Sequence, residues 1–221
     1  MIVFDSKNEL ELALCAQIAN DLTAAIEQKG KATLLLSGGS TPSGVYHLLS
    51  EQPLAWSQIT IGLVDERFVS ADSPFSNFKL LRETIAQNMA SEVQVLPMVV
   101  DPTHYAENLK QIEESYRIFT EPDVVLLGMG PDGHTASIFP NDVASAQANQ
   151  NKETLLSNTT APAEPTQRIT LNGPVLRNAK KLYLMMTGAQ KKEVFENSEA
   201  QHLPIASFAP ALTQIYYTPA S

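Results

Sequence analysis

Two patterns of apolar residues alternate along the chain. Uninterrupted apolar runs are typical of strands buried on both faces, and apolar residues that recur every three or four positions are typical of amphipathic helices. We predict strands at residues 32–36, 59–64, 93–98, 123–128, 168–171, 182–188 and 214–218. We predict helices at residues 14–26 with a stop at Gly30, 42–49, 77–89, 104–117 and 189–197, and a helical turn after Pro174.

The alternation of strands and helices predicts an α/β fold. Successive βαβ units build a mostly parallel sheet with helices on both faces. Residues 141–166 lack periodicity and are rich in Asn, Ala, Thr and Pro, so we expect an irregular excursion with at most one short helix. A length of 221 residues suffices for a large core, and we expect residues 1–221 to form a single domain.

Composition and charge narrow the class of partner. The chain has 24 acidic and 15 basic residues and a formal net charge of -9. Nucleic acids and anionic membranes need a basic surface, so neither is expected as a partner. A small anionic molecule is still compatible with this charge as a partner, because a few local cations can bind it. No apolar segment approaches the ~20 residues of a membrane span, and the N-terminus lacks the features of a signal peptide, so the expected location is the cytoplasm.

The cysteine and histidine content argues against a metal site. The single cysteine, Cys15, excludes an intramolecular disulfide and a thiolate cluster, and its apolar helical context predicts inert packing. The four histidines have no metal-ligand spacing, so no bound metal is expected.

Four predicted strands are followed by polar or glycine-rich segments: SGGSTP (37–42), DER (65–67), GMGPDGH (128–134) and TGAQKK (187–192). Ligands bind at the carboxyl ends of the strands in parallel sheets. The four segments are therefore predicted to converge on one site.

The SGGSTP segment combines glycines with hydroxyl side chains before a predicted helix. Thr41 and Pro42 suit the N-cap and first helical positions. The free amides of a helix N-terminus favour an anion, so Gly38, Gly39, Ser40 and Thr41 are candidate anion-binding residues. The segment matches neither a Walker A loop nor a dinucleotide loop. A plain strand-to-helix turn is the alternative.

Three cations are candidate ligands for that anion. Arg67 follows a buried strand directly, and Asp65 or Glu66 could fix its orientation. Arg168 and Lys191 could bind a phosphate together, the planar guanidinium through several N–H groups and the ammonium through its charge. The alternative for each is an ordinary solvated surface charge.

The GMGPDGHTAS segment places His134 in a glycine-rich loop after a buried strand. Such a histidine can accept a proton, and Asp132 could orient its imidazole or the substrate. The alternative is a surface histidine in a flexible loop. No G-x-S-x-G elbow occurs, so we expect direct acid or base catalysis without a covalent nucleophile. These residues alone do not name the bond that breaks.

Taken together and in this order, SGGSTP, DERFV, SNFKLL, GMGPDGHTASIFP, RIT and TGAQKK resemble the 6-phosphogluconolactonases over essentially the whole chain. The related glucosamine-6-phosphate deaminases share two of these blocks but continue with an AFNEP-like sequence where this chain has TASIFP. The resemblance implies a modified Rossmann-like fold with a smaller lobe. It also implies hydrolysis of 6-phospho-D-glucono-1,5-lactone, a sugar-phosphate substrate, in the oxidative pentose phosphate pathway, with no cofactor.

Carried over to this sequence, the resemblance makes His134 the general base and Arg168 and Lys191 the phosphate-binding cations. Gly39, Ser40 and Thr41 would form the cradle, and Asp132 and Arg67 would line the pocket. A monomer or weak homo-oligomer is expected. An amino-sugar-phosphate isomerase-deaminase and a non-catalytic sugar-phosphate sensor are the two alternatives.

Overall fold

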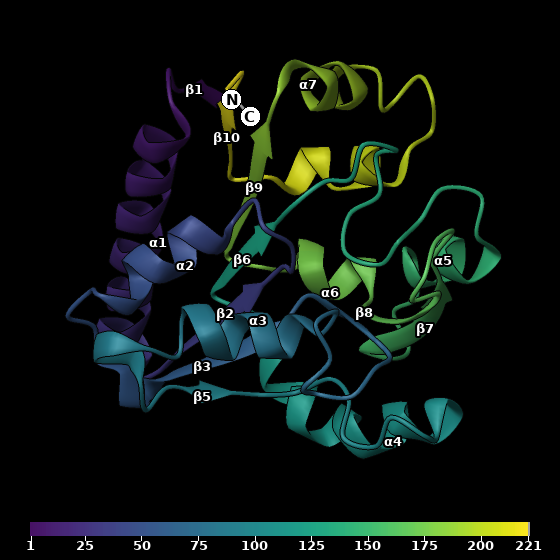
Figure 1. Cartoon of the computed structure of the whole chain (residues 1–221), viewed down its shortest axis with the longest axis horizontal. Helices are drawn as coiled ribbons and strands as arrows, with labels where there is room; N and C mark the ends of the chain where they lie inside the picture. The colour runs from purple at the N-terminus through teal and green to yellow at the C-terminus, as the bar shows by residue number, and fades with distance from the viewer. Residues whose placement is uncertain (221) are drawn as a thin grey trace.

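A seven-stranded sheet in which every pair of neighbours is parallel forms the centre of the fold. The structure is a computed structural model and describes residues 1–220. In spatial order, the strands are β1 (Ile2–Val3), β10 (Gln214–Thr218), β9 (Lys181–Thr187), β6 (Val124–Leu127), β2 (Ala32–Leu36), β3 (Ile59–Leu63) and β5 (Gln94–Val95). The strands nearest the two ends of the chain, β1 and β10, are neighbours at one side of this sheet (Figure 1).

Seven α-helices are assigned within the described residues: α1 (Lys7–Lys29), α2 (Ser43–Ser50), α3 (Asn77–Thr84), α4 (Tyr105–Tyr116), α5 (Val143–Ala148), α6 (Gly173–Arg177) and α7 (Ala189–Glu196). In Figure 1, α1 and α2 lie on one side of the sheet and α6 lies on the other. The predicted stop at Gly30 is confirmed, because Gly30 has a φ of 75° and its amide donates to the carbonyl of Ile26. None of the helices in residues 1–220 is long and apolar enough to cross a membrane.

A second, antiparallel sheet forms the smaller lobe. It contains β4 (Asp65–Arg67), β8 (Gln167–Leu171) and β7 (Leu156–Thr160), in that order. The expectation that residues 141–166 are irregular is therefore wrong for β7, a polar strand without an apolar run. One cluster of buried apolar side chains includes residues of both sheets, such as Leu36 and Leu126 of the large sheet and Ile169 and Leu171 of the small one.

Several predicted boundaries also change. The helix predicted at 77–89 ends at Thr84 and is followed by a 3-10 turn at Asn88–Ala90. The strand predicted at 93–98 shortens to Gln94–Val95, because only these residues pair with β3. Both differences reflect tertiary pairing, which an apolar pattern does not encode.

Candidate functional site

A cavity of about 200 Å³ opens at the carboxyl edge of the parallel sheet. The segments after β2, β6 and β9 reach it from the large sheet, and β4 and β8 reach it from the small one. The predicted convergence of these segments is confirmed, although 65–67 reaches the cavity as a strand. The predicted residues that line the cavity are Gly38, Gly39, Thr41, Arg67, His134, Arg168 and Lys191.

The segment after β2 presents unpaired amides to this cavity. Within residues 1–220, the amides of Gly39, Ser40 and Thr41 meet no hydrogen-bond acceptor. Gly39 has a φ of 92°, which favours glycine and turns the backbone toward the helix that follows. Ser40 is exposed and does not line the cavity. The amides therefore offer an anion site of the kind found at helix N-termini.

The predicted cap of this helix is wrong by one residue. Helix α2 begins at Ser43, and its N-cap is Pro42, which already has right-handed helical backbone angles. No side chain caps the helix, so the hydroxyl of Thr41 is not used for this purpose. Its position beside the cavity leaves that hydroxyl for a ligand.

His134 is held by Asp132. The imidazole Nδ1 lies 2.5 Å from Oδ1 of Asp132, and the amide of His134 lies 3.2 Å from the same oxygen. Burial disfavours the ionised carboxyl group, but the hydrogen bonds and charge of His134 outweigh it and keep the pKa of Asp132 below its ordinary value. Asp132 contacts the imidazole but does not line the cavity. Its carboxylate is thus placed to orient the imidazole of His134.

Two glycines explain how a histidine fits into this loop. A Cβ on Gly130 would lie 2.2 Å from the imidazole of His134, so only glycine leaves room for the ring. Gly133 has a φ of 77°, and a Cβ there would lie 2.7 Å from Cδ1 of Leu203. The glycines that make the segment look flexible in sequence are therefore in close contact, Gly130 with the imidazole of His134 and Gly133 with Leu203.

Arg67 and Arg168 are direct cross-strand partners in β4 and β8. Each is tethered by a backbone carbonyl, Arg67 Nη1 by Phe75 at 2.7 Å and Arg168 Nε by Pro165 at 2.7 Å. Burial, followed by the charge of Arg67, lowers the pKa of Arg168. Like charges opposite each other are unfavourable, so the pair is suited to an anion that neutralises both.

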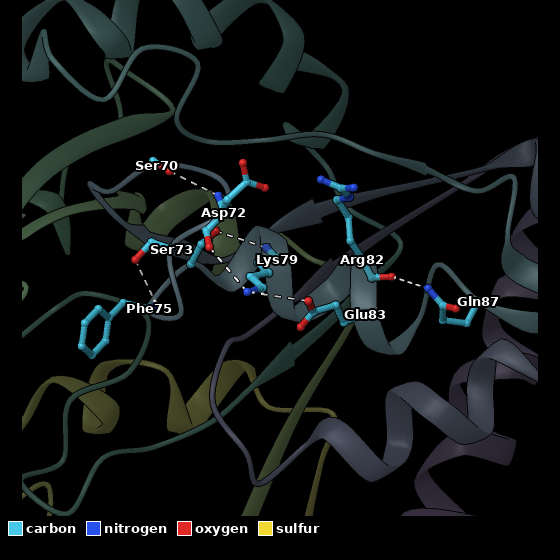
Figure 2. Close-up of polar contacts among 9 residues, drawn as sticks. Ser70, Asp72, Ser73, Phe75, Lys79, Arg82, Glu83 and Gln87 are labelled. Atoms are coloured by element: carbon cyan, nitrogen blue, oxygen red, sulfur yellow. Dashed lines mark hydrogen bonds and ion pairs between the residues drawn. The ribbon is translucent and has the colours of Figure 1, made fainter.

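The loop that tethers Arg67 is braced by its own side chains. In Figure 2, the hydroxyl of Ser70 accepts from the amide of Asp72 at 3.3 Å, and that of Ser73 accepts from the amide of Phe75 at 3.2 Å. The carbonyl of Phe75, in the same loop, accepts from the guanidinium of Arg67. Within residues 1–220, the guanidinium of Arg67 donates to no acidic side chain, although the Glu66 carboxylate accepts from the backbone amide of Arg67 at 2.8 Å.

The expectation that Asp65 or Glu66 orients the Arg67 guanidinium is wrong. The buried carboxylate of Glu66 accepts from the amides of Asn77 and Phe78 and from the hydroxyl of Ser76, at the start of α3. The free amides of a helix N-terminus attract an acidic side chain, so Glu66 serves the helix. Asp65 accepts a hydrogen bond from Ser137.

Lys191 is the third cation of the cavity. It lies in the first turn of α7, directly after β9. Burial lowers its pKa, as expected for an ammonium group that is partly removed from water. A phosphate would restore the favourable environment of this charge.

Two further side chains of this region have no distinct signal in the sequence. Asn77 lines the cavity, and its side-chain amide donates to the carbonyl of Asp65 at 2.9 Å. Phe139 is buried, with its ring centroid 4.8 Å from that of His134 and 5.7 Å from Cζ of Arg168. Both lie inside the SNFKLL and GMGPDGHTASIFP segments, but nothing in the spacing distinguishes them from their neighbours. Within residues 1–220, no group of three His, Cys, Asp or Glu is arranged to hold a metal ion.

Comparisons with known proteins agree with this geometry. The model of the family described as glucosamine-6-phosphate isomerases/6-phosphogluconolactonase matches residues 5–217. A 6-phosphogluconolactonase from Mesorhizobium japonicum is 35% identical over 225 residues, which cover 98% of this chain and 94% of the relative. One from Rhizobium meliloti is 34% identical and covers 99% of this chain and 98% of the relative.

Solved structures agree as well. The crystal structure of a 6-phosphogluconolactonase from Shewanella baltica superposes with a TM-score of 0.89 at 34% identity, covering 98% of this chain and 96% of that one. The enzyme from Trypanosoma brucei gives a TM-score of 0.79 at 27% identity, covering 98% and 95%. The chain therefore belongs to the glucosamine-6-phosphate isomerase/6-phosphogluconolactonase family, and the predicted resemblance to its lactonases is confirmed.

Proposed function

We propose that this enzyme hydrolyses 6-phospho-D-glucono-1,5-lactone to 6-phosphogluconate, as a step of the oxidative pentose phosphate pathway, with His134 as the general base. One observation carries the proposal. An imidazole oriented by a carboxylate lines the same small cavity as Arg67, Arg168 and Lys191. A base and an anion anchor thus share one cavity, as a phosphorylated lactone requires.

The hydrogen bond between His134 and Asp132 sets the direction of proton transfer. With Nδ1–H donated to the Asp132 carboxylate, Nε2 is free to accept a proton from water. The resulting hydroxide attacks the lactone carbonyl and forms a tetrahedral oxyanion. Collapse breaks the bond to the ring oxygen, which takes the proton back from the imidazolium. Water is consumed, and the histidine returns to its neutral form.

The cations act on a group that does not react. Arg67, Arg168 and Lys191 would bind the phosphate, together with the free amides of Gly39 and Thr41. Binding energy from this remote group serves to orient the carbonyl against His134. A lactone is an activated ester, so a base and correct positioning suffice without a covalent nucleophile.

A paired assay tests the proposal. Purified protein is mixed separately with 6-phosphogluconolactone and with glucosamine 6-phosphate, and acid release and ammonia release are followed. Acid release from the lactone well above its spontaneous opening is expected, without ammonia from the amino sugar. Ammonia release alone would instead identify an isomerase-deaminase, and binding without turnover of either compound would identify a sensor.

A further inference from the structure

The loop that carries His134 ends in a buried turn. The amide of Ile138 donates to the carbonyl of Thr135 at 3.0 Å, which closes a turn over Ala136 and Ser137. Ser137 is 0% exposed. Its hydroxyl donates to Oδ2 of Asp65 at 2.5 Å, across 72 residues of sequence. The turn is therefore attached to the small sheet by a side chain that does not line the cavity.

Asp65 belongs to the face of the small sheet that carries the arginines. Asp65 is opposite Thr170, and Arg67 is opposite Arg168. Side chains of paired residues in an antiparallel sheet lie on the same face, and every second residue of a strand shares that face. Asp65, Thr170, Arg67 and Arg168 thus share one face. The amide of Ser137 also lies 3.4 Å from Oγ1 of Thr170.

The backbone beside Ser137 is in a conformation that needs support. Ala136 lines the cavity and has a φ of 52°, in the left-handed region that residues with a Cβ disfavour. Such a conformation persists where the surroundings hold it. The carbonyl of Ser137 accepts from Thr159 Oγ1 at 2.7 Å, so the turn is held from both its hydroxyl and its carbonyl.

We infer that Ser137 is a positioning residue that sets the distance between the general base and the phosphate anchors. Its hydrogen bond to Asp65 joins the loop of His134 to the strand of Arg67, and His134 precedes it by only three residues. The inference rests on the proposed function, because it assigns the anchors to the phosphate and His134 to the chemistry.

The test compares two substrates on one protein. We expect Ser137→Ala to lower kcat/KM for the phosphorylated lactone about 10-fold more than for unphosphorylated gluconolactone, because only the phosphorylated substrate uses the spacing between anchor and base. The ratio of the two values does not change when part of the protein is merely inactive. A simple loss of folded enzyme would therefore leave it at the wild-type value.

Ser145→Ala is the matched control. Ser145 is also 0% exposed, and its hydroxyl contacts the carbonyl of Ser137 at 3.4 Å and Asp142 at 2.6 Å, but not Asp65. Its substrate ratio should stay near that of the wild type. If Ser137→Ala is insoluble, Ser137→Cys takes its place, since a thiol is only slightly larger but a much weaker donor, which lengthens and weakens the contact with Asp65.

An unchanged ratio in the soluble Ser137 variant would overturn the inference. A wild-type protein that does not hydrolyse the phosphorylated lactone at all would instead refute the proposed function. The two failures are distinguishable, because the second appears before any variant is made.

Discussion

The two sheets contribute to the cavity in different ways. Strands β2 and β6 of the large sheet are apolar and completely buried, and their functional groups stand in the loops that follow them. In the small sheet, Arg67 and Arg168 stand on the strands themselves. The position of His134 thus depends on a loop built around glycines, whereas the positions of the arginines depend on strand register.

The buried side chains of the two sheets also differ in chemistry. The large sheet is built on apolar burial, which is non-directional. The small sheet buries Asp65, Glu66, Thr159 and Thr170, and each takes part in a hydrogen bond. Buried polar groups stabilise a structure only where their partners are in place. Particular hydrogen-bonded pairs of residues therefore define the small sheet. Variants in each sheet can test whether the proposed chemistry depends on the loop of the large sheet and the proposed phosphate binding on the strands of the small one.

The largest expected effect on turnover comes from a substitution in the loop that follows β6 of the large sheet. His134→Ala should reduce kcat by about 10²-fold or more, in the range of losing a general base. Lactone hydrolysis is measured by acid release, with the spontaneous rate subtracted. The exposed His47 provides the control, and His47→Ala should keep wild-type turnover. Near-normal turnover in folded His134→Ala would mean that another group removes the proton.

The next effect concerns two cations of the cavity, Arg168 in β8 of the small sheet and Lys191 in α7. Arg168→Ala should chiefly raise KM, by roughly 10- to 150-fold, the worth of a charge-assisted hydrogen bond. Lys191→Ala should act in the same direction. With unphosphorylated gluconolactone, both changes should matter little, because the group they bind is missing. The exposed Arg117 serves as a control. An equal loss of kcat/KM by Arg168→Ala with both lactones would place Arg168 at the reacting carbonyl or in the scaffold.

Ligand-free stability should respond in the opposite direction to activity. Arg168→Gln removes one of two like charges that face each other across β4 and β8, so its Tm without ligand should equal or exceed that of the wild type. Inorganic phosphate should raise the Tm of the wild type, by an amount equivalent to about 2.7 kcal/mol at 100 times its Kd. The gain should be much smaller in Arg168→Gln, as measured by thermal unfolding. Equal gains in both proteins would show that Arg168 does not contact phosphate.

The smallest expected effect is a pH dependence at Asp132. Its pKa lies below the ordinary 3.8, so the stability it contributes is present above that pH and is lost as the pH falls through the lower, folded-state value. Asp132→Asn should therefore be less stable than the wild type at pH 5 to 8, by less than about 1 kcal/mol for a partly exposed pair. Denaturant unfolding across pH should show this difference disappear in strong acid. A difference that persists there would assign it to packing.

Much of the large sheet could be predicted because its strands are apolar. The predicted strands 32–36 and 214–218 match β2 and β10 to the residue, since each contains a short run of apolar and aromatic residues, LLL in β2 and IYY in β10. Strands β4 and β7, with the sequences DER and LSNTT, have no such run. They are strands because β8 pairs with both, and that pairing joins residues about 100 positions apart in the case of β4.

The sequence by itself determined which residues are the candidates for the chemistry: a histidine among glycines, two arginines and a lysine in polar segments next to strands. It also determined the large sheet, because apolar periodicity is a local property of the chain. Only the tertiary structure decided that Arg67 faces Arg168, that Glu66 accepts from the first amides of α3 and that Ser137 reaches Asp65. These are contacts between distant segments, and they depend on strand register and buried hydrogen bonds that no local pattern encodes.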